Sequence, residues 1–217
     1  MSVAFITARL GSKRLKRKNI KNFYGRPVIS YSILACIKCK SFDRVIVSTE
    51  SELIAKIARK YSAEVPHLRP RRLAKSKTTT LELIKYLVKK FQLKKNQIVC
   101  CVYPVAPLLK PSFLEKSIKV FKKLKCDFLL PVVKVRKFDK SIFAINKKNI
   151  IIKYDRVSKV MYKDTGQFYI GTANSFLNSK SILYSGNSKA IVVRKNSALD
   201  VNTIHDWNKL KKMFLKK

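Results

Sequence analysis

The sequence predicts an α/β fold in three layers, with helices on both faces of a mostly parallel sheet. One reason is that short apolar runs alternate with amphipathic stretches of helical period through residues 1–130. A second is that 47% of the 217 residues are hydrophobic, enough to fill the core of one domain of ordinary size. A third is that no apolar run approaches the roughly 20 residues of a membrane-spanning helix.

Strands are predicted where short apolar runs are bounded by polar or turn-forming residues. Runs of this kind are typical of strands that are buried on both faces of a parallel sheet. The predicted strands cover residues 3–6, 44–47, 98–102, 128–133, 167–170 and 190–193.

Helices are predicted where apolar residues recur at intervals of three and four. Pro27 is expected to open the first of them, because proline is tolerated in the first turn of a helix. The predicted helices cover residues 27–39, 53–61, 81–91, 114–124 and 204–215.

The stretch 142–153 interrupts the alternation with two short strands and a turn at Lys147, Lys148 and Asn149. We therefore predict a single domain over residues 1–217, in which residues 136–162 form a small protruding β-hairpin. Such a hairpin often makes a subunit contact, so we expect a homodimer that forms through this dimerisation segment.

The charge balance is extreme, with 49 basic and 12 acidic residues and a net charge of +37. This balance is typical of a protein that binds nucleic acid or an anionic surface, or of a surface on which lysine has accumulated at solvated positions. The lysines are spread over the whole chain, without an aromatic platform or a recognisable binding module. We favour the second interpretation and expect nucleic acid to bind only non-specifically.

Cysteine usage indicates a reducing compartment. There are five cysteines, an odd number, and the N-terminal apolar stretch is too short for a secretory signal. Cys36 and Cys39 have CxxC spacing but lie in a helical pattern, and a zinc site needs four converging ligands. We expect free thiols and a cytoplasmic protein without membrane insertion.

The twelve acidic residues can be sorted by their positions, because ligands of an open α/β sheet bind beyond the carboxyl ends of its strands. Glu50, Asp164 and Asp200 lie near strand ends on this side, so metal or acid–base chemistry would draw mainly on them. Four other acids are expected in capping boxes at helix starts. These pairs are Thr49–Glu52, Thr79–Glu82, Ser112–Glu115 and Thr203–Asp206.

A cationic loop, ARLGSKRLKRKN, follows the first predicted strand at residues 8–19. Gly11 allows close approach of the backbone to a ligand, and successive N–H groups can form an anion-binding nest. Arg9, Lys13 and Lys18 add positive charge, and Ser12 adds a hydroxyl. The loop has neither GxxxxGK[ST] nor GxGxxG spacing, so a phosphate site and a solvated basic loop both remain open at this point.

Together with later segments, this loop resembles the opening of the cytidylyltransferases that activate nonulosonic acids. The opening reads ARLGSKRLKRKNIKNFYGRPVISYSI, and VIVSTESELIAKIARKYSAEV, HLRP, VYPVAPLL, DTGQFYIG and ALDVNTIHDW follow in the family's order. The family includes N-acylneuraminate and pseudaminic acid cytidylyltransferases, with a related branch for 3-deoxy-manno-octulosonate. The GQFY segment is most similar to the pseudaminic acid branch.

The resemblance implies a Rossmann-like nucleotide-diphospho-sugar transferase fold and a nucleotidyltransferase activity in cell-surface glycan biosynthesis. CTP and a nine-carbon 2-keto sugar acid would give the CMP-sugar and pyrophosphate. The anomeric hydroxyl would attack the α-phosphorus in line, with Mg²⁺ as cofactor. The resemblance also suggests a homodimer.

Site residues follow from the resemblance position by position. Arg9, Lys18 and Asp200 would be catalytic, and Asp200 would hold Mg²⁺ together with the amide oxygen of Asn202. The nucleotide would be bound by Ala8, Arg9, Leu10, Gly11, Ser12, Lys13, Lys18, Asn19, Arg69 and Tyr103.

The sugar acid would be bound by Asp164, Gln167, Phe168 and Arg156, although Arg156 lies in a poorly matched segment. Plain core packing is an equal interpretation for Phe168, and it is the favoured one for Tyr103.

Two departures from the family pattern bear on function. Relatives usually have a second glycine where this chain has Leu10, and the usual Asp-x-Asp reads Asp200-Val201-Asn202 here. Loss of one carboxylate should weaken magnesium binding. The alternatives to an active enzyme are therefore a catalytically weakened relative that still binds nucleotide and, less favoured, a basic protein that binds nucleic acid or an anionic surface.

Overall fold

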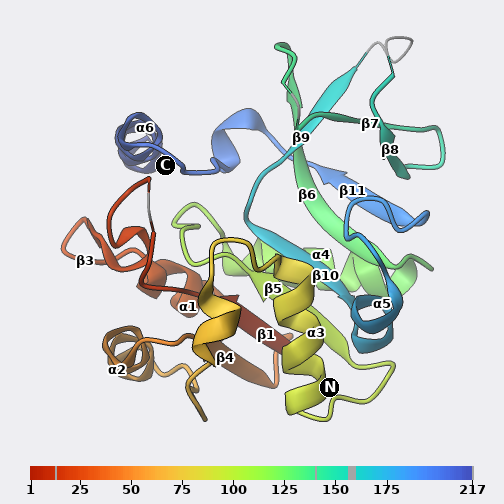
Figure 1. Ribbon diagram of the computed structural model, residues 1–217. Coiled ribbons are helices and arrows are strands. Elements are labelled where there is room, and N and C mark those ends of the chain that lie inside the picture. Colours follow the sequence, from red (N-terminus) through yellow and green to blue (C-terminus); the bar gives the residue numbers. More distant parts are fainter. Residues whose placement is uncertain (13, 140, 156–159, 217) are drawn as a thin grey trace.

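A mixed sheet of nine strands forms the centre of the computed structural model, which describes residues 1–217 except 13, 140, 156–159 and 217 (Figure 1). The order across the sheet is β4 (Arg44–Ser48), β1 (Ser2–Thr7), β5 (Ile98–Val102), β10 (Phe168–Thr172), β6 (Phe128–Val135), β9 (Met161–Asp164), β7 (Phe143–Ile145) and β8 (Ile151–Lys153), and β11 (Ser188–Val192) also pairs with β6.

Five strands, β4, β1, β5, β6 and β11, share one direction, which confirms the predicted mostly parallel sheet. β1 pairs in parallel with β4 and with β5, and β11 pairs in parallel with β6. β10 runs antiparallel between β5 and β6, so β5 and β6 point the same way. The carboxyl ends of β4, β1 and β5 therefore lie at one edge of the sheet, where a ligand is expected.

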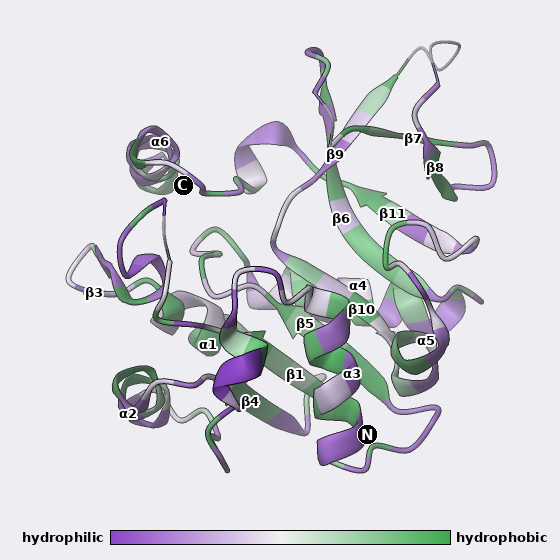
Figure 2. Cartoon of the chain, viewed as in Figure 1, coloured by the Kyte–Doolittle hydropathy of each residue, from purple (hydrophilic) through white to green (hydrophobic). Residues whose placement is uncertain are grey.

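Helices cover both faces, because alternate side chains of the buried strands point to opposite sides. Ala4 and Ile6 of β1 pack with α1 (Ile29–Ile37), α2 (Glu52–Lys60) and α4 (Pro111–Lys123). Val3 and Phe5 pack with α3 (Thr80–Lys90) and α5 (Ala173–Asn178). Figure 2 shows hydrophobic residues concentrated along the central strands and hydrophilic ones on loops and outer helix turns.

A third apolar cluster attaches the last helix, α6 (Ile204–Leu215), to the segment that follows the cationic loop. Phe23 lies at its centre, and its ring is 5.4 Å from those of Tyr31 and Trp207 and 5.2 Å from that of Phe214. The chain on both sides of Phe23 forms a short hairpin of β2 (Asn22–Phe23) and β3 (Arg26–Pro27). Pro27 therefore ends this hairpin, and α1 starts two residues later than the sequence predicts.

Two of the four predicted capping boxes are wrong. Ser51 caps α2 in place of Thr49, and its hydroxyl accepts a bond from the third helical N–H at 3.4 Å. α4 begins at Pro111, whose fixed φ suits a first helical position, so Ser112 does not cap it. Glu115 instead accepts a hydrogen bond from the backbone N–H of Lys40 at 3.0 Å.

At the other two helix starts, Thr79 caps α3 by accepting the N–H of Glu82 at 3.1 Å, which is one half of the predicted box, and Thr203 forms a complete capping box with Asp206 at α6. Short 3-10 turns cover Lys18–Ile20, Arg71–Ala74 and Lys195–Ser197. β9 and the short helix α5 are not among the predicted elements.

The predicted hairpin forms, but it continues the main sheet. β7 pairs antiparallel with β8, and its Phe143 also pairs with Tyr162 of β9, which in turn pairs with β6. Backbone pairing therefore ties the hairpin to the core, and its role in dimerisation stays a prediction. All five cysteines are free, and four of them are buried. Among the described residues, no helix is both long and apolar enough to cross a membrane.

Candidate active site

A cleft of about 480 Å³ lies beyond the carboxyl ends of β1 and β5. Its wall is built from the cationic loop after β1, from residues 69–83, from residues 103–105 after β5, and from residues 200–202 with Gly166. Segments far apart in the sequence thus meet at the edge of the sheet where the fold class places a ligand.

The backbone of the cationic loop is fixed on the side away from this cleft. The N–H of Ala8 donates to the carbonyl of Ser48 at 3.0 Å, and the N–H of Leu10 donates to Glu50 Oε1 at 2.8 Å. Arg9 and Ser12 line the cleft, whereas Ala8, Leu10 and Gly11 are not part of its lining. Lys13, also predicted to bind phosphate, lies outside the described residues.

Asn19 follows the loop and is 7% exposed. Its Nδ2 donates to the carbonyl oxygen of Arg9 at 2.8 Å, and its side chain lines the cleft. Asn19 therefore both fixes the loop and contributes to the predicted nucleotide site.

Five cationic residues line the cleft: Arg9, Arg14, Lys18, Arg69 and Lys75. Lys18 Nζ donates to the carbonyl of Val201 at 2.5 Å, which joins the loop to the 200–202 segment. Burial lowers the pKa of Lys18; the charge of Asp200 opposes this shift, and those of Arg14 and Arg9 add to it. Positive side chains that share one cleft repel one another, and a polyanion bound between them would relieve this repulsion.

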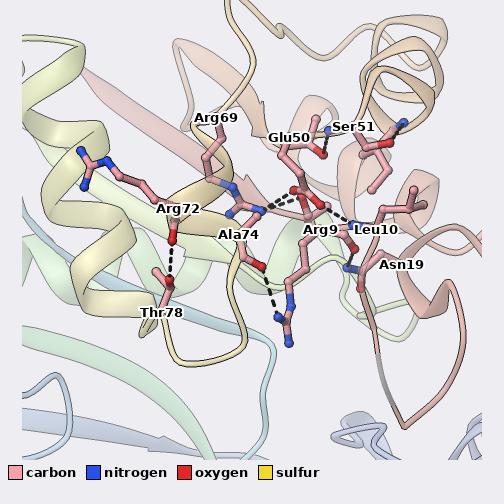
Figure 3. A network of polar contacts seen from close by, with 12 residues as sticks. Arg9, Leu10, Asn19, Glu50, Ser51, Arg69, Arg72, Ala74 and Thr78 are labelled. Atoms are coloured by element: carbon pink, nitrogen blue, oxygen red, sulfur yellow. Dashed lines mark hydrogen bonds and ion pairs between the residues drawn. The ribbon is translucent and has the colours of Figure 1, made fainter.

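Arg69 and Glu50 form an ion pair behind the loop, shown in Figure 3. The Nη2–Oε2 distance is 3.0 Å, and the side chains are 3% and 15% exposed. Because Glu50 also accepts the Leu10 N–H, its two oxygens are both engaged, and it is not part of the cleft lining. The structure thus gives Glu50 a place in the scaffold, not the open position that metal or acid–base chemistry needs.

Asp200 lies in the cleft wall with its carboxylate held from one side. Asn202 Nδ2 donates to Asp200 Oδ2 at 2.7 Å, and Asp206 accepts the backbone N–H groups of Asn202 and Thr203 at 3.0 and 2.8 Å. The amide of Asn202 therefore orients the carboxylate of Asp200, while the capping box of α6 holds the turn.

The oxygen ligands at this site suit a hard divalent cation that takes most of its ligands from a bound polyphosphate and from water. Within the part of the chain that the structure describes, no group of three or more His, Cys, Asp or Glu side chains could hold a metal ion. Asp200 can offer a carboxylate oxygen, and Mg²⁺ commonly takes one or two carboxylates and fills its shell with phosphate oxygens and waters. The residues therefore fit a cation that binds together with a polyphosphate.

A chain of hydroxyl groups joins Asp164 to the opposite wall of the cleft. Asp164 accepts from the N–H of Gly166 at 2.9 Å and from the Tyr169 hydroxyl. The Tyr103 hydroxyl is 3.3 Å from that of Tyr169 and 3.1 Å from Thr80 Oγ1. Burial raises the pKa of Asp164, and the neighbouring Asp200 acts in the same direction.

The predicted sugar-acid residues do not gather at one surface. Asp164 lines a hollow of about 320 Å³ that shares Asp200 and Asn202 with the cleft. Gln167 is buried and donates to the carbonyl of Ser197, and Phe168 is fully buried in the core. Neither of the latter two lines the cleft, and Arg156 lies outside the described residues.

Sequence reasoning missed the hydroxyl-rich segment before α3. Thr78, Thr79 and Thr80 line the cleft, and α3 starts at Thr80, so a helix N-terminus borders the site. Helix N-termini favour anions because their first N–H groups lack partners within the helix. The hydroxyl-rich run KSKTTT is the signal for this segment, and only a helix cap at Thr79 is predicted from it.

Cationic side chains, the N-terminus of α3 and one carboxylate thus converge as expected of a protein that binds a nucleoside polyphosphate with a divalent cation. The family model for cytidylyltransferases matches residues 3–199, and the chain belongs to this cytidylyltransferase family. Members of this family are nucleotidyltransferases that use CTP, so the predicted family and enzyme class are confirmed.

The pseudaminic acid cytidylyltransferase of Campylobacter jejuni is 31% identical to this chain, over 94% of the chain and 92% of that protein. The CMP-N,N'-diacetyllegionaminic acid synthase of Legionella pneumophila is 28% identical over 94% of the chain and 92% of that protein. A solved CMP:2-keto-3-deoxy-manno-octonic acid synthetase complexed with CTP has a TM-score of 0.79 at 14% identity, covering 99% of this chain and 98% of that one. This structural likeness confirms the Rossmann-like fold.

Proposed function

We propose that the protein is a CMP-sugar synthetase that transfers the cytidylyl group of CTP to a nine-carbon 2-keto sugar acid of the pseudaminic type. The observation that carries the proposal is the single cleft that Arg9, Lys18 and Asp200 all line, in a chain of the cytidylyltransferase family. The choice of sugar acid is supported by the name of the Campylobacter jejuni relative.

In the proposed reaction, the anomeric oxygen of the sugar acid attacks the α-phosphorus of CTP. The bond from the α-phosphorus to the oxygen that bridges to the β-phosphate breaks, pyrophosphate leaves, and the hydroxyl proton passes to solvent. Arg9 and Lys18 would neutralise charge on the phosphates, so catalysis would rest on positioning and electrostatic stabilisation.

The proposed cofactor is Mg²⁺, with Asp200 as its protein ligand. The ion would supply positive charge to the phosphate oxygens. Asn202 would contribute by holding the Asp200 carboxylate, as its 2.7 Å hydrogen bond to Oδ2 indicates.

A coupled assay for pyrophosphate tests the activity. Purified protein with CTP and magnesium is given pseudaminic, legionaminic or N-acetylneuraminic acid, and the product is identified as CMP-sugar by mass spectrometry. We expect release with at least one acid, most rapidly with pseudaminic acid, and little with ATP or UTP in place of CTP. Absence of release with every acid of this class would refute the proposal.

We also propose that the chain acts as a homodimer in the cytoplasm, where CTP is available and the five free thiols stay reduced. The hairpin segment carries Phe138, which is 70% exposed and lies near Tyr154 with a ring distance of 6.0 Å. A Phe138→Ser substitution should shift the mass measured by light scattering towards the monomer. An unchanged dimer would place the interface elsewhere.

A further inference from the structure

We propose that Glu50 is a positioning residue for the triphosphate of CTP, which acts through the backbone of residues 8–10 without touching the nucleotide. The inference rests on the proposed function for the identity of the ligand. Glu50 lies behind the cationic loop, outside the cleft lining, and its side chain is 15% exposed.

The position of Glu50 is determined by the elements on both sides of it. β4 ends at Ser48, and Ser51 caps α2, so one turn of chain is held at both ends. Within that turn, the N–H of Ser51 donates to Thr49 Oγ1 at 3.2 Å, and the carbonyl of Thr49 accepts the N–H of Arg69 at 2.7 Å. Because this turn is held at both ends, the Glu50 side chain can hold its hydrogen-bond partners in place.

The carboxylate of Glu50 joins two other segments to this support. Its Oε1 accepts the N–H of Leu10 at 2.8 Å, and its Oε2 accepts from Arg69 Nη2 at 3.0 Å (Figure 3). Arg69 Nη2 also donates to the carbonyl of Ala8 at 3.1 Å. Both hydrogen bonds of Glu50 are charge-assisted, which makes them stronger than bonds between neutral groups.

The consequence is that the peptide unit between Arg9 and Leu10 is fixed at both ends. Its N–H is bound to Glu50, and its carbonyl oxygen accepts from Asn19 Nδ2 at 2.8 Å. If this unit rotated, the carbonyl oxygen could turn towards the anion, and the Arg9 side chain would be displaced from the cleft wall. Glu50 therefore keeps Arg9 and Ser12 facing the cleft.

This arrangement also accommodates Leu10, where relatives usually have glycine. Leu10 packs its side chain against the core cluster of α1, α2 and α4, while its amide is bound to Glu50. The leucine side chain thus adds an apolar contact to a backbone hydrogen bond that glycine could also make at this position.

Three variants separate positioning from general stability. Glu50→Ala removes both hydrogen bonds; Glu50→Gln keeps an acceptor for Leu10 but loses the negative charge opposite Arg69. Glu52→Ala is the matched control, because Glu52 is two residues away with a side chain that is 73% exposed. For each protein, calorimetry gives the Kd for CTP, steady-state kinetics give the KM for the sugar acid, and thermal denaturation confirms folding.

We expect Glu50→Ala to weaken CTP binding by about tenfold or more, since displacement of positioning groups by 1 Å can cost on the order of 10²-fold. Glu50→Gln should weaken CTP binding less. The KM for the sugar acid at saturating CTP should stay within about twofold of the wild-type value for every variant, and Glu52→Ala should match the wild type.

Unchanged CTP affinity in folded Glu50→Ala would overturn the proposal, as would an equal loss for CTP and the sugar acid. If Glu50→Ala does not fold, Glu50→Gln decides: weaker CTP binding with an unchanged KM for the sugar acid supports the inference, and unchanged CTP binding refutes it. A wild-type protein that binds no CTP would instead refute the proposed function, so the two failures can be told apart.

Discussion

Asp200 is the residue on which the proposed chemistry most depends. Its carboxylate lines the cleft, and Lys18 reaches the backbone of its neighbour Val201. Its side chain is exposed and belongs to no apolar cluster, so its removal should leave the fold intact.

We therefore predict that Asp200→Ala lowers the rate of pyrophosphate release by roughly 10²-fold or more, the usual scale for loss of one electrostatic group at a reacting centre. Circular dichroism should show an unchanged fold. Wild-type activity in this variant would remove Asp200 from the metal site.

Asn202 distinguishes a complete site from a weakened one. In Asn202→Asp, the hydrogen bond from the amide to Asp200 is lost, and two carboxylates come to lie where a cation would relieve their repulsion. We predict that half-maximal activity then needs less magnesium, by on the order of tenfold. A large rise in maximal rate would favour the weakened-relative alternative, and an unchanged magnesium dependence would show that Asn202 is not coupled to the metal.

Residues of one contiguous motif could be assigned to the site from the sequence alone. A residue whose role depends on a partner far along the chain could not. Arg9, Ser12 and Lys18 belong to one contiguous motif, and the structure places all of them in the cleft wall. Glu50 was a candidate for metal or acid–base chemistry because of its place after a strand. Its pairing with Leu10, 40 positions away, could not be read from spacing.

The last helix, α6, couples the core to the turn that carries Asp200. Trp207 is 3% exposed and packs on Phe23, while the capping box just before it holds the turn at residues 202–203. The packing of α6 on the core therefore helps to set the position of the turn that carries Asp200.

Trp207→Ala should destabilise the protein by about 3–5 kcal/mol, because the truncation leaves a cavity. It should also raise the magnesium concentration needed for activity at a temperature where the variant is folded. Lys212→Ala, an exposed change on the same helix, is the control and should leave both values unchanged. If Trp207→Ala altered stability alone, α6 would not help to position Asp200.

Strands and helices with strong periodicity were predicted nearly at their observed bounds, as β5 and α6 show. The apolar run of β10 was predicted too, but its antiparallel direction was not, since direction depends on the connection through β9. The caps of α2 and α4 differ from the predicted ones because Ser51 offers a cap two residues after Thr49, and because α4 already begins at Pro111, one residue before Ser112.

The net charge of +37 should speed the arrival of CTP. We predict that kcat/KM for CTP falls by about tenfold as ionic strength rises from roughly 0.05 to 0.5 M, because salt screens long-range attraction. The kcat should change much less. A value of kcat/KM that is independent of salt would mean that the excess charge plays no part in substrate capture.

Calorimetric titration of the purified protein with CTP, with and without magnesium, is the sharpest test of whether this cleft binds the nucleotide. We expect one CTP to bind per chain, clearly more weakly when magnesium is withheld and when Arg9 is replaced by alanine. If the folded protein takes up no CTP in the presence of magnesium, the cleft is not a CTP site.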